Sequence, residues 1–295
     1  MAISTERIFI IGGTGNIGSK AVKDLLSKKI ALTLYARTPS KVEAMFPQSQ
    51  DLINIVEGDL ADLTSFKQSI EGHTRLFLLL TDFNGFAQNK KEIAQIAYEA
   101  GVKQIVDISS FTVNLGWRTS YIGTTHFDAE KAIYDLPNRG RFVALRPGRF
   151  MTNVLMADRP SADNKIFDSV DANSCYGYIS TNDIGAVAAV VLTEDIEKHA
   201  DSVYSLSGDM VSPNQRAQIV SDIVGRKISY QQITAAQKYR VIMGLGHYDH
   251  CMAMDFCGPL ATPDTSVVTP EISILLGREP ETLKEFLNAN KSAFL

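Results

Sequence analysis

The glycine-rich stretch GGTGNIG, residues 12–18, decides the fold. It follows the apolar run RIFII at 7–11 and opens NIGSKAVKDLLSKK at 16–29, whose apolar residues recur with helical spacing. Glycines between a strand and a helix permit a tight turn and let the backbone approach a pyrophosphate at the positive end of the helix. The stretch satisfies both GxGxxG and GxxGxxG, so it predicts a dinucleotide-binding turn without choosing its subtype. A glycine-rich turn that binds no ligand is the competing interpretation.

The first half of the chain alternates between short apolar runs and segments with helical spacing. Strands are expected at 7–11, 30–36, 53–57, 75–80, 104–109 and 141–146, and further helices at 63–70, 86–101 and 125–136. Near-continuous apolar runs are typical of strands buried on both faces of a parallel sheet. The pattern predicts an α/β fold with a Rossmann-type, doubly wound parallel sheet, and an NAD(P)-binding domain over residues 1–150.

Residues 151–295 are expected to form a smaller, mixed α/β portion on the substrate side. It is expected to be interwoven with the first domain, because the strand-like SVYSLSG at 202–208 can return to the sheet. N-cap, proline and glycine signals place helix ends at Ser212-Pro213, Gly225, Thr269-Pro270-Glu271, Gly277 and Pro280. The stretch at 244–260 has no assignment.

Composition limits the class of protein. The 295 residues are 45% hydrophobic and 21% charged, which fits a globular chain with a sizeable core. A net charge of −4 gives no basic excess, so no direct nucleic-acid partner is expected. Three cysteines are too few for a disulfide framework. MAISTERIFI lacks the regions of a signal peptide, and no apolar run approaches the roughly 18 residues of a membrane span. A cytoplasmic protein without membrane association is therefore expected.

The cofactor is predicted from the end of the second strand. A NAD site usually has an acidic residue about 20 positions after the glycines, but LYARTPSK at 34–41 has none. Arg37 instead presents a planar cation suited to a 2′-phosphate, and Lys41 can add a second charge. These residues favour NADP(H), with a solvated loop charge as the alternative for Arg37. Asp59, after the third strand, is expected either to face the adenine or to form a turn.

The motifs taken together resemble those of the NmrA-like family, atypical members of the short-chain dehydrogenase/reductase superfamily. The resemblance rests on GGTGNIG, Arg37, GDL at 58–60, DISS at 107–110, HFDAEK at 126–131, LRPGRFMTN at 145–153, YISTNDIGA at 178–186, SLSGDMVS at 205–212 and LLGREPETLKEFL at 275–287. The motifs and the resemblance together give as candidate cofactor-binding residues Gly12, Thr14, Gly15, Asn16, Ile17, Arg37, Lys41, Asp59, Leu60, Leu80, Thr81, Ser109, Lys131, Gly148 and Phe150.

The resemblance also implies an altered active helix. In the wider superfamily this helix carries YxxxK, whose tyrosine transfers a proton while its lysine holds the nicotinamide ribose. Aligned on that pattern, Lys131 is kept and Phe127 replaces the tyrosine, so the standard proton transfer cannot run from this helix. The resemblance implies that Lys131 anchors the ribose and that Ser109 or Ser110 lies beside the nicotinamide.

Two side chains are candidate proton donors in place of the tyrosine. His126 is expected in the first turn of the helix, and a neutral imidazole can donate a hydrogen bond near neutral pH. The alternative is a helix-terminal histidine paired with Glu130. Tyr121 is the second candidate, with an ordinary surface tyrosine in the preceding loop as its alternative.

The stretch HYDHCMAMDFC at 247–257 contains histidines and cysteines that invite a zinc interpretation. Its spacing matches no recognised ligand pattern and nothing marks the Cys251 thiolate as stabilised, so no metal site or thiol nucleophile is predicted. A helix or lid over the substrate cleft is favoured. An apolar lining for a flat substrate, or alternatively interdomain core, is expected from Trp117, Tyr121, Phe150, Met151, Met156, Tyr176 and Tyr178.

Two functions from different classes remain open. The first is an NADPH-dependent reductase that passes a hydride to a quinone, an azo dye or a similar electron-poor acceptor. The reduced anions of such acceptors are delocalised and need less help from an acid, which makes the missing tyrosine tolerable. The second is a non-catalytic NADP(H)-sensing regulator with a protein partner, a class that the resembled family contains. A sugar-nucleotide epimerase relies on the YxxxK tyrosine and is disfavoured. The sequence identifies neither the substrate nor the oligomeric state.

Overall fold

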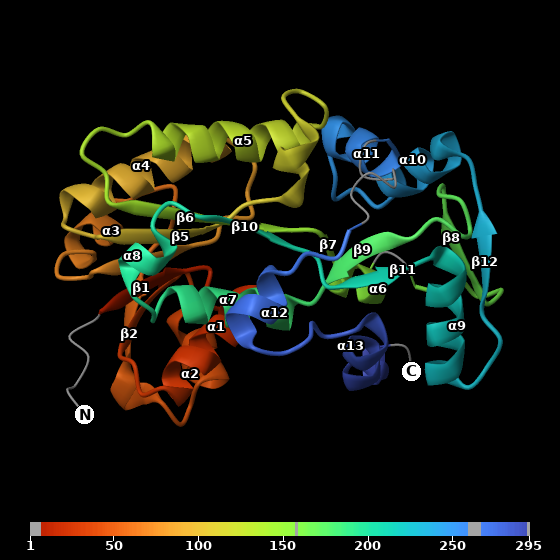
Figure 1. The fold of residues 1–295 in the computed structure, drawn as a ribbon, viewed down its shortest axis with the longest axis horizontal. Helices are drawn as coiled ribbons and strands as arrows, with labels where there is room; N and C mark the ends of the chain where they lie inside the picture. The colour runs from red at the N-terminus through yellow and green to blue at the C-terminus, as the bar shows by residue number, and fades with distance from the viewer. Residues whose placement is uncertain (1–6, 157–158, 259–266, 294–295) are drawn as a thin grey trace. The chain divides into compact units, whose positions relative to one another are not determined.

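The computed structural model describes residues 7–156, 159–258 and 267–293 (Figure 1). The chain divides into two compact units, each assembled from three segments of the sequence. The first unit comprises residues 1–109, 125–146 and 184–204, and the second comprises 110–124, 147–183 and 205–295. The two-domain division predicted at residue 150 stays a prediction.

A seven-stranded sheet with the order β10-β6-β5-β4-β1-β2-β3 organises the first unit. Its strands are β1 (Ile8–Ile11), β2 (Leu32–Ala36), β3 (Ile53–Glu57), β4 (Arg75–Leu78), β5 (Gln104–Ile108), β6 (Arg141–Pro147) and β10 (Val203–Leu206). The neighbouring pairs from β6 to β3 are parallel, and Ile8 of β1 aligns with Leu32 on one side and Arg75 on the other. The doubly wound prediction and the return of the 202–208 segment to this sheet are thereby confirmed.

Helices cover both faces of this sheet (Figure 1). They are α1 (Asn16–Ser27), α2 (Pro39–Met45), α3 (Thr64–Ser69), α4 (Phe86–Glu99), α5 (Tyr121–Tyr134), α7 (Thr181–Val191) and α8 (Ile196–His199), with a 3-10 turn at Gln50–Leu52. The continuous apolar runs explain the topology, because every residue of β1, β4 and β5 is buried. Such strands require a helical layer on each side. The strand order reverses between β1 and β4, which is where Rossmann-type sheets bind ligands.

The second unit contains two small sheets, β11-β9-β7 and β12-β8. Their strands are β7 (Arg149–Phe150), β8 (Lys165–Asp168), β9 (Tyr176–Ile179), β11 (Asp209–Val211) and β12 (Ser229–Gln232). The helices are α6 (Thr152–Met156), α9 (Pro213–Val224), α10 (Ala235–Gly244), α11 (His250–Cys257), α12 (Glu271–Leu276) and α13 (Leu283–Ala289), with 3-10 turns at Phe111–Leu115 and Lys291–Ala293.

Local signals set most of these helix ends. Ser212 forms a capping box at the start of α9, and Gly225 ends it in the left-handed conformation, as expected. The last helix begins after Pro280, at Leu283, because Thr282 supplies its own capping box. Within the unassigned stretch 244–260, residues 250–257 form α11, whose N-cap is Asp249, and residues 259 and 260 lie outside the described residues.

Candidate active site

The glycine turn is built for close backbone contact. Gly12 has a φ of +87°, and a Cβ at this position would lie 2.8 Å from the carbonyl oxygen of Leu79. A Cβ on Gly18 would lie 2.2 Å from the carbonyl oxygen of Gly12, so α1 packs directly against the turn. The N-cap of α1 is Gly15, which provides no side-chain hydrogen bond to the first helical amides. These amides can therefore bind the oxygens of a pyrophosphate.

Two cations stand at the carboxyl end of β2. Arg37 directly follows the strand, and Lys41 lies in the first turn of α2; both are exposed. Neither side chain makes a hydrogen bond or an ion pair with any residue that the structure describes. Both cations are thus available for an anionic group beside the glycine turn, as a 2′-phosphate requires.

Asp59 occupies the loop after β3 and forms a turn. Its carboxylate accepts a hydrogen bond from the amide of Ala61 at 2.9 Å, while its carbonyl oxygen accepts one from the Tyr35 hydroxyl at 3.1 Å. The side chain is exposed. Of the two interpretations of Asp59, the structure displays the turn; a contact with adenine stays a prediction. Leu60 and Leu80 pack against the core at the same edge, and Thr81 is exposed.

A charged network lies at the carboxyl end of β5. Ser109 is buried, and its hydroxyl donates a short hydrogen bond to the carboxylate of Glu130 on α5. Arg146 of β6 binds the same carboxylate through Nε at 2.9 Å and through a second nitrogen at 2.5 Å. Ser109 therefore lies at the carboxyl end of β5, and its place beside the nicotinamide stays a prediction. Glu130, however, faces it rather than Lys131.

The register of α5 explains this difference. His126, Ala129, Glu130 and Ile133 are buried at helical spacing, whereas Lys131 points to the surface, where its ammonium pairs with Asp135. The Lys131 side chain is 61% exposed. Apolar residues three and four apart mark a helix's buried face, so Ala129 and Ile133 already carried the signal that assigns Glu130 to this face. The ribose-anchoring role of Lys131 stays a prediction.

His126 lies in an aromatic environment. Its ring meets Phe86 edge-on at a centroid distance of 4.8 Å and Phe83 at 5.7 Å. The side chain is 7% exposed, and Nδ1 is buried with no hydrogen bond to a described residue. Burial, together with the charge of Lys90, holds the pKa of His126 well below its usual value. The alternative interpretation, a pairing of His126 with Glu130, is not observed, because that carboxylate binds Ser109 and Arg146.

A buried ion pair, missed in the sequence, supports this site from α4. Lys90 and Asp107 are both fully buried, with 2.6 Å between the ammonium and one carboxylate oxygen. The ammonium also donates to the carbonyl oxygen of Ile108 at 2.9 Å. Burial raises the pKa of Asp107 to about 6 despite its cation, and burial lowers the pKa of Lys90. The ammonium has three favourable contacts, with the Asp107 carboxylate, with the carbonyl oxygen of Ile108 and with the ring of Phe86.

The remaining candidates belong to the second unit. The amide of Tyr121, in the first turn of α5, donates to the carboxylate of Asp255 on α11 at 2.9 Å. Gly148 donates its amide to the carbonyl oxygen of Leu206 at 2.9 Å, and Phe150 lies in β7 beside Ile179 of β9. Cofactor contacts by Gly148 and Phe150, and a catalytic role of Tyr121, stay predictions.

The seven expected lining residues have different surroundings. Met151, Tyr176 and Tyr178 are buried in the core of the second unit. Trp117 and Met156 are among the most exposed apolar residues, at 67% and 73%. Met151, Tyr176 and Tyr178 therefore belong to the core of one unit, and the interdomain position stays a prediction.

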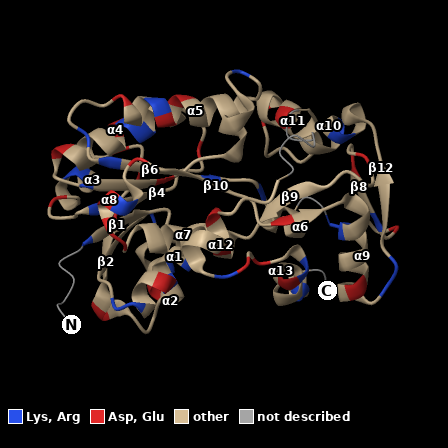
Figure 2. Cartoon of the chain, viewed as in Figure 1, with Lys and Arg blue, Asp and Glu red and all other residues tan. Residues whose placement is uncertain are grey.

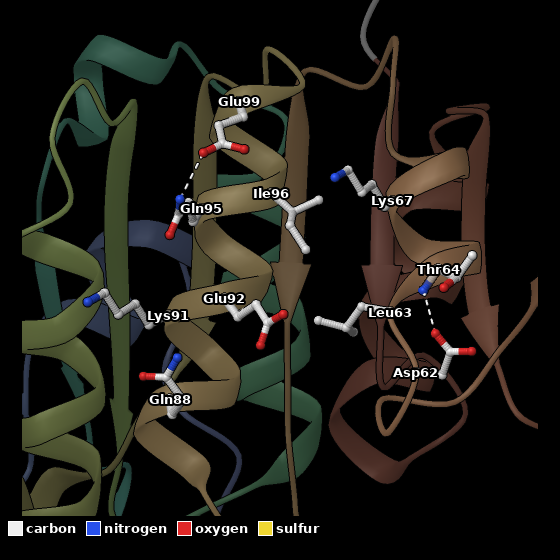
Figure 3. Close-up of a pocket in the computed structure, with 10 residues that line it drawn as sticks. All are labelled: Asp62, Leu63, Thr64, Lys67, Gln88, Lys91, Glu92, Gln95, Ile96 and Glu99. Carbon is white, nitrogen blue, oxygen red and sulfur yellow. Dashed lines mark hydrogen bonds between the residues drawn. The ribbon is translucent and has the colours of Figure 1, made fainter.

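A surface groove of about 640 Å³ lies between α3 and α4 (Figure 3). It is lined by Asp62, Leu63, Thr64, Lys67, Gln88, Lys91, Glu92, Gln95, Ile96 and Glu99. This lining is mostly polar and includes no candidate cofactor residue. The groove therefore lacks the apolar character that a flat aromatic substrate requires.

Acidic and basic residues are interspersed along α4 and α5 (Figure 2). Within residues 7–156, 159–258 and 267–293, no group of three or more His, Cys, Asp or Glu side chains could hold a metal ion. Across the same residues, every helix is too short or too polar to cross a membrane.

The sheet, its glycine turn and the uncapped α1 define a Rossmann-type, dinucleotide-binding class of protein. The model of the NmrA-like family matches residues 4–287, and the chain belongs to this family. The family resemblance of the motifs is thus confirmed.

Similar proteins include characterised reductases. The chain is 26% identical over 293 residues to NAD(P)H azoreductase of Xenophilus azovorans, covering 97% of this chain and 99% of the relative. It is 26% identical over 244 residues to quinone oxidoreductase 2 of Escherichia coli (strain K12), covering 81% and 82%. The solved structure of the Escherichia coli NADPH-dependent quinone oxidoreductase complexed with NADPH has a TM-score of 0.82 at 22% identity, covering 96% of this chain and 99% of that one.

Proposed function

We propose that this protein is an NADPH-dependent oxidoreductase that reduces an electron-poor organic acceptor, such as a quinone or an azo compound. The observation that carries the proposal is the arrangement of uncapped α1 amides beside the unpaired cations Arg37 and Lys41. The two relatives at 26% identity, an azoreductase and a quinone oxidoreductase, support the choice of acceptor.

The residues of the first unit have distinct roles in this proposal. The α1 amides hold the pyrophosphate, and Arg37 with Lys41 holds the 2′-phosphate. NADPH, when bound, supplies a hydride from its nicotinamide. The imidazole of His126 donates a hydrogen bond to the acceptor atom that gains negative charge, and Ser109 is held in place by Glu130. Delocalised acceptor anions are protonated by water, so no tyrosine is needed.

Turnover with a panel of acceptors tests the proposal. Purified protein is mixed with NADPH and with quinones or azo dyes, and absorbance at 340 nm is followed. We expect consumption of NADPH that depends on the acceptor. Tight NADPH binding without turnover across the panel would contradict the reductase and favour the second candidate, the NADP(H)-sensing regulator. The observation that favours this candidate is Phe127, which has no proton to transfer.

Cofactor selectivity tests the role of Arg37. Arg37→Asp removes a charge-assisted contact and adds repulsion, so the Kd for NADPH should rise about 100-fold, roughly 3 kcal/mol, while that for NADH changes little. Calorimetric titration measures both. The control is Lys67→Asp, which makes the same charge change in the groove of Figure 3. Equal losses for the two cofactors in Arg37→Asp would show that Arg37 does not read the phosphate.

A further inference from the structure

The buried ammonium of Lys90 is the feature that the proposed mechanism does not yet use. Its side chain is 0% exposed and reaches from α4 to the carboxyl end of β5, where it contacts Asp107 and the carbonyl oxygen of Ile108. A fully buried lysine is costly unless its charge is compensated. Its location at the strand end that carries Ser109 suggests a function beyond packing.

Lys90 and His126 share one aromatic neighbour. The ammonium lies 4.4 Å from the centroid of the Phe86 ring, and the imidazole contacts the same ring at 4.8 Å. The ring of Phe83 stacks on Phe86 at 5.0 Å and also contacts the imidazole. The imidazole is therefore enclosed by apolar rings, with a positive charge close behind them.

The other charged groups near His126 are already engaged. Glu130, one turn further along α5, binds Ser109 and Arg146. Asp107, on β5, binds Lys90 itself. No described carboxylate is hydrogen-bonded to the imidazole. A protonated ring would consequently face the Lys90 ammonium without a compensating anion, which disfavours the charged form.

We propose that Lys90 is a positioning residue that acts together with burial to keep His126 uncharged, so that the imidazole serves as a hydrogen-bond donor and not as a titrating acid. This inference rests on the proposed reductase function. Nδ1 is buried without an acceptor, and a buried N–H without an acceptor is rarer than a bare lone pair. The proton is therefore assigned to Nε2, which is the nitrogen that remains to donate a hydrogen bond to the organic substrate.

The chemistry balances without a proton from the protein. With NADPH bound, a quinone would accept a hydride as the C4–H bond of the nicotinamide broke; an O–H bond would form on one quinone oxygen, and the second oxygen would become a phenolate. Nε2–H of His126 stabilises this phenolate by a hydrogen bond while the ring keeps its proton. Water then protonates the phenolate. The reduced nicotinamide is the only reductant, and His126 begins and ends the step in the same state.

Titration of His126 by NMR tests the link in the free protein, without NADPH. The chain has five histidines, and a His126→Gln variant assigns the signal. Lys90→Met keeps the length of the side chain and removes its charge, so the pKa of His126 should rise. The matched control is Lys91→Met at the next position of the same helix, one of the residues that line the groove, and it should leave that pKa unchanged.

A double variant keeps the test decisive if Lys90→Met does not fold. Lys90→Met/Asp107→Asn removes both buried charges and leaves a neutral pair, and the pKa of His126 should rise in it as well. An unchanged His126 pKa in every folded variant that lacks the ammonium would overturn the proposal.

The pH dependence of turnover gives a second readout. In the unmodified protein, kcat with a quinone should stay flat through neutral pH because His126 does not titrate there. In Lys90→Met, kcat should gain an ionisation at the His126 pKa measured by NMR. KM for NADPH should stay within about twofold, because the Lys90 side chain is fully buried and is not among the residues that we assign to the cofactor. A pH profile identical to that of the unmodified protein, despite a shifted His126 pKa, would overturn the role of Lys90. Failure of the reductase itself would show differently, as missing turnover in the unmodified protein.

Discussion

Two buried carboxylates, one in each unit, have pKa values that are shifted in opposite directions. Asp107 is fully buried beside one cation, Lys90, and burial raises its pKa to about 6. Asp168, at the end of β8, is equally buried, and burial also acts to raise its pKa. The charges of Arg149, Lys238 and Arg216 outweigh that effect and hold the pKa at about 2.

The difference lies in the number and kind of cations. Lys238 pairs with Asp168 at 2.7 Å, while Arg149 and Arg216 approach to 3.7 and 3.8 Å from separate elements. A guanidinium cannot lose its proton, whereas a lysine or a carboxyl can. Arg149 of β7 and Arg216 of α9 therefore give Asp168 permanent positive charges, and Lys238 of α10 adds a third cation. Asp107, by contrast, is paired with a lysine that can itself lose its proton, and this pair lies beside the candidate active site.

Removing the Asp168 carboxylate should have the largest effect on stability. Asp168→Asn leaves buried cations without their carboxylate, so the free energy of unfolding should fall by about 3 kcal/mol. Denaturant unfolding at pH 7 measures this as a lower midpoint at constant slope. Asp163→Asn, on an exposed carboxylate in the same unit, is the control and should change stability by less than about 0.5 kcal/mol. An equal effect of the two substitutions would show that Asp168 does not hold these elements together.

Lowering the pH should weaken the stabilisation that the Asp168 carboxylate provides. Because folding lowers the pKa of Asp168 from 3.8 to about 2, its stabilisation is present above pH 4 and is lost as the pH falls toward 2. The loss should amount to roughly 2 kcal/mol. Unfolding measured at several pH values should show this slope in the unmodified protein and a weaker one in Asp168→Asn. Parallel curves for the two proteins would argue against a lowered pKa.

Loss of the cation from the Lys90–Asp107 pair should destabilise the protein less than Asp168→Asn does. In Lys90→Met the Asp107 carboxyl can take up a proton, because its pKa is already about 6 and rises further without the ammonium. The unfolding free energy should therefore fall by only about 1.5 kcal/mol, the cost of lost contacts and hydrogen bonds. Lys91→Met again serves as control. If Lys90→Met costs as much as Asp168→Asn, the proposed contrast between the two pairs is wrong.

Asp255 extends the comparison to a buried carboxylate that binds amides. It accepts hydrogen bonds from the first two amides of α5, those of Tyr121 and Ile122, at 2.9 and 2.7 Å. Burial raises its pKa, and these amides oppose the rise. Asp255→Ala should cost about 1 kcal/mol, as the loss of a helix cap does. Hydrogen exchange should speed up at Tyr121 and Ile122; Asp249→Ala should instead affect the Met252 amide, which Asp249 caps.

Much of the fold could be predicted because its signals are local. The buried strands of the sheet are apolar runs, and the glycine turn stands between a strand and a helix as its spacing requires. The cation at Arg37 was also predictable, because the sequence shows an arginine at the end of the second strand, where NAD sites usually have an acid. The capping box at Ser212 and the αL glycine at Gly225 set a helix from neighbouring residues alone.

The candidate site was harder because adjacent polar residues look alike. Lys90 and Lys91 stand side by side, yet Lys90 is fully buried and Lys91 lines a groove. Glu130 and Lys131 differ in the same way. Helical periodicity could have separated both pairs, because Ile93 and Ala94 continue the buried face of Lys90 as Ala129 and Ile133 continue that of Glu130.

The sequence by itself determined the strand and helix alternation, the phosphate-binding turn and the basic end of β2, because each depends on residues close together in the chain. Only the tertiary structure decided which charges meet. Asp107 receives Lys90 from another element, and Asp168 is approached by Arg149, Lys238 and others from separate elements. The pKa of a buried group depends on its distance from such charges and from water, and neither distance is written in the local sequence.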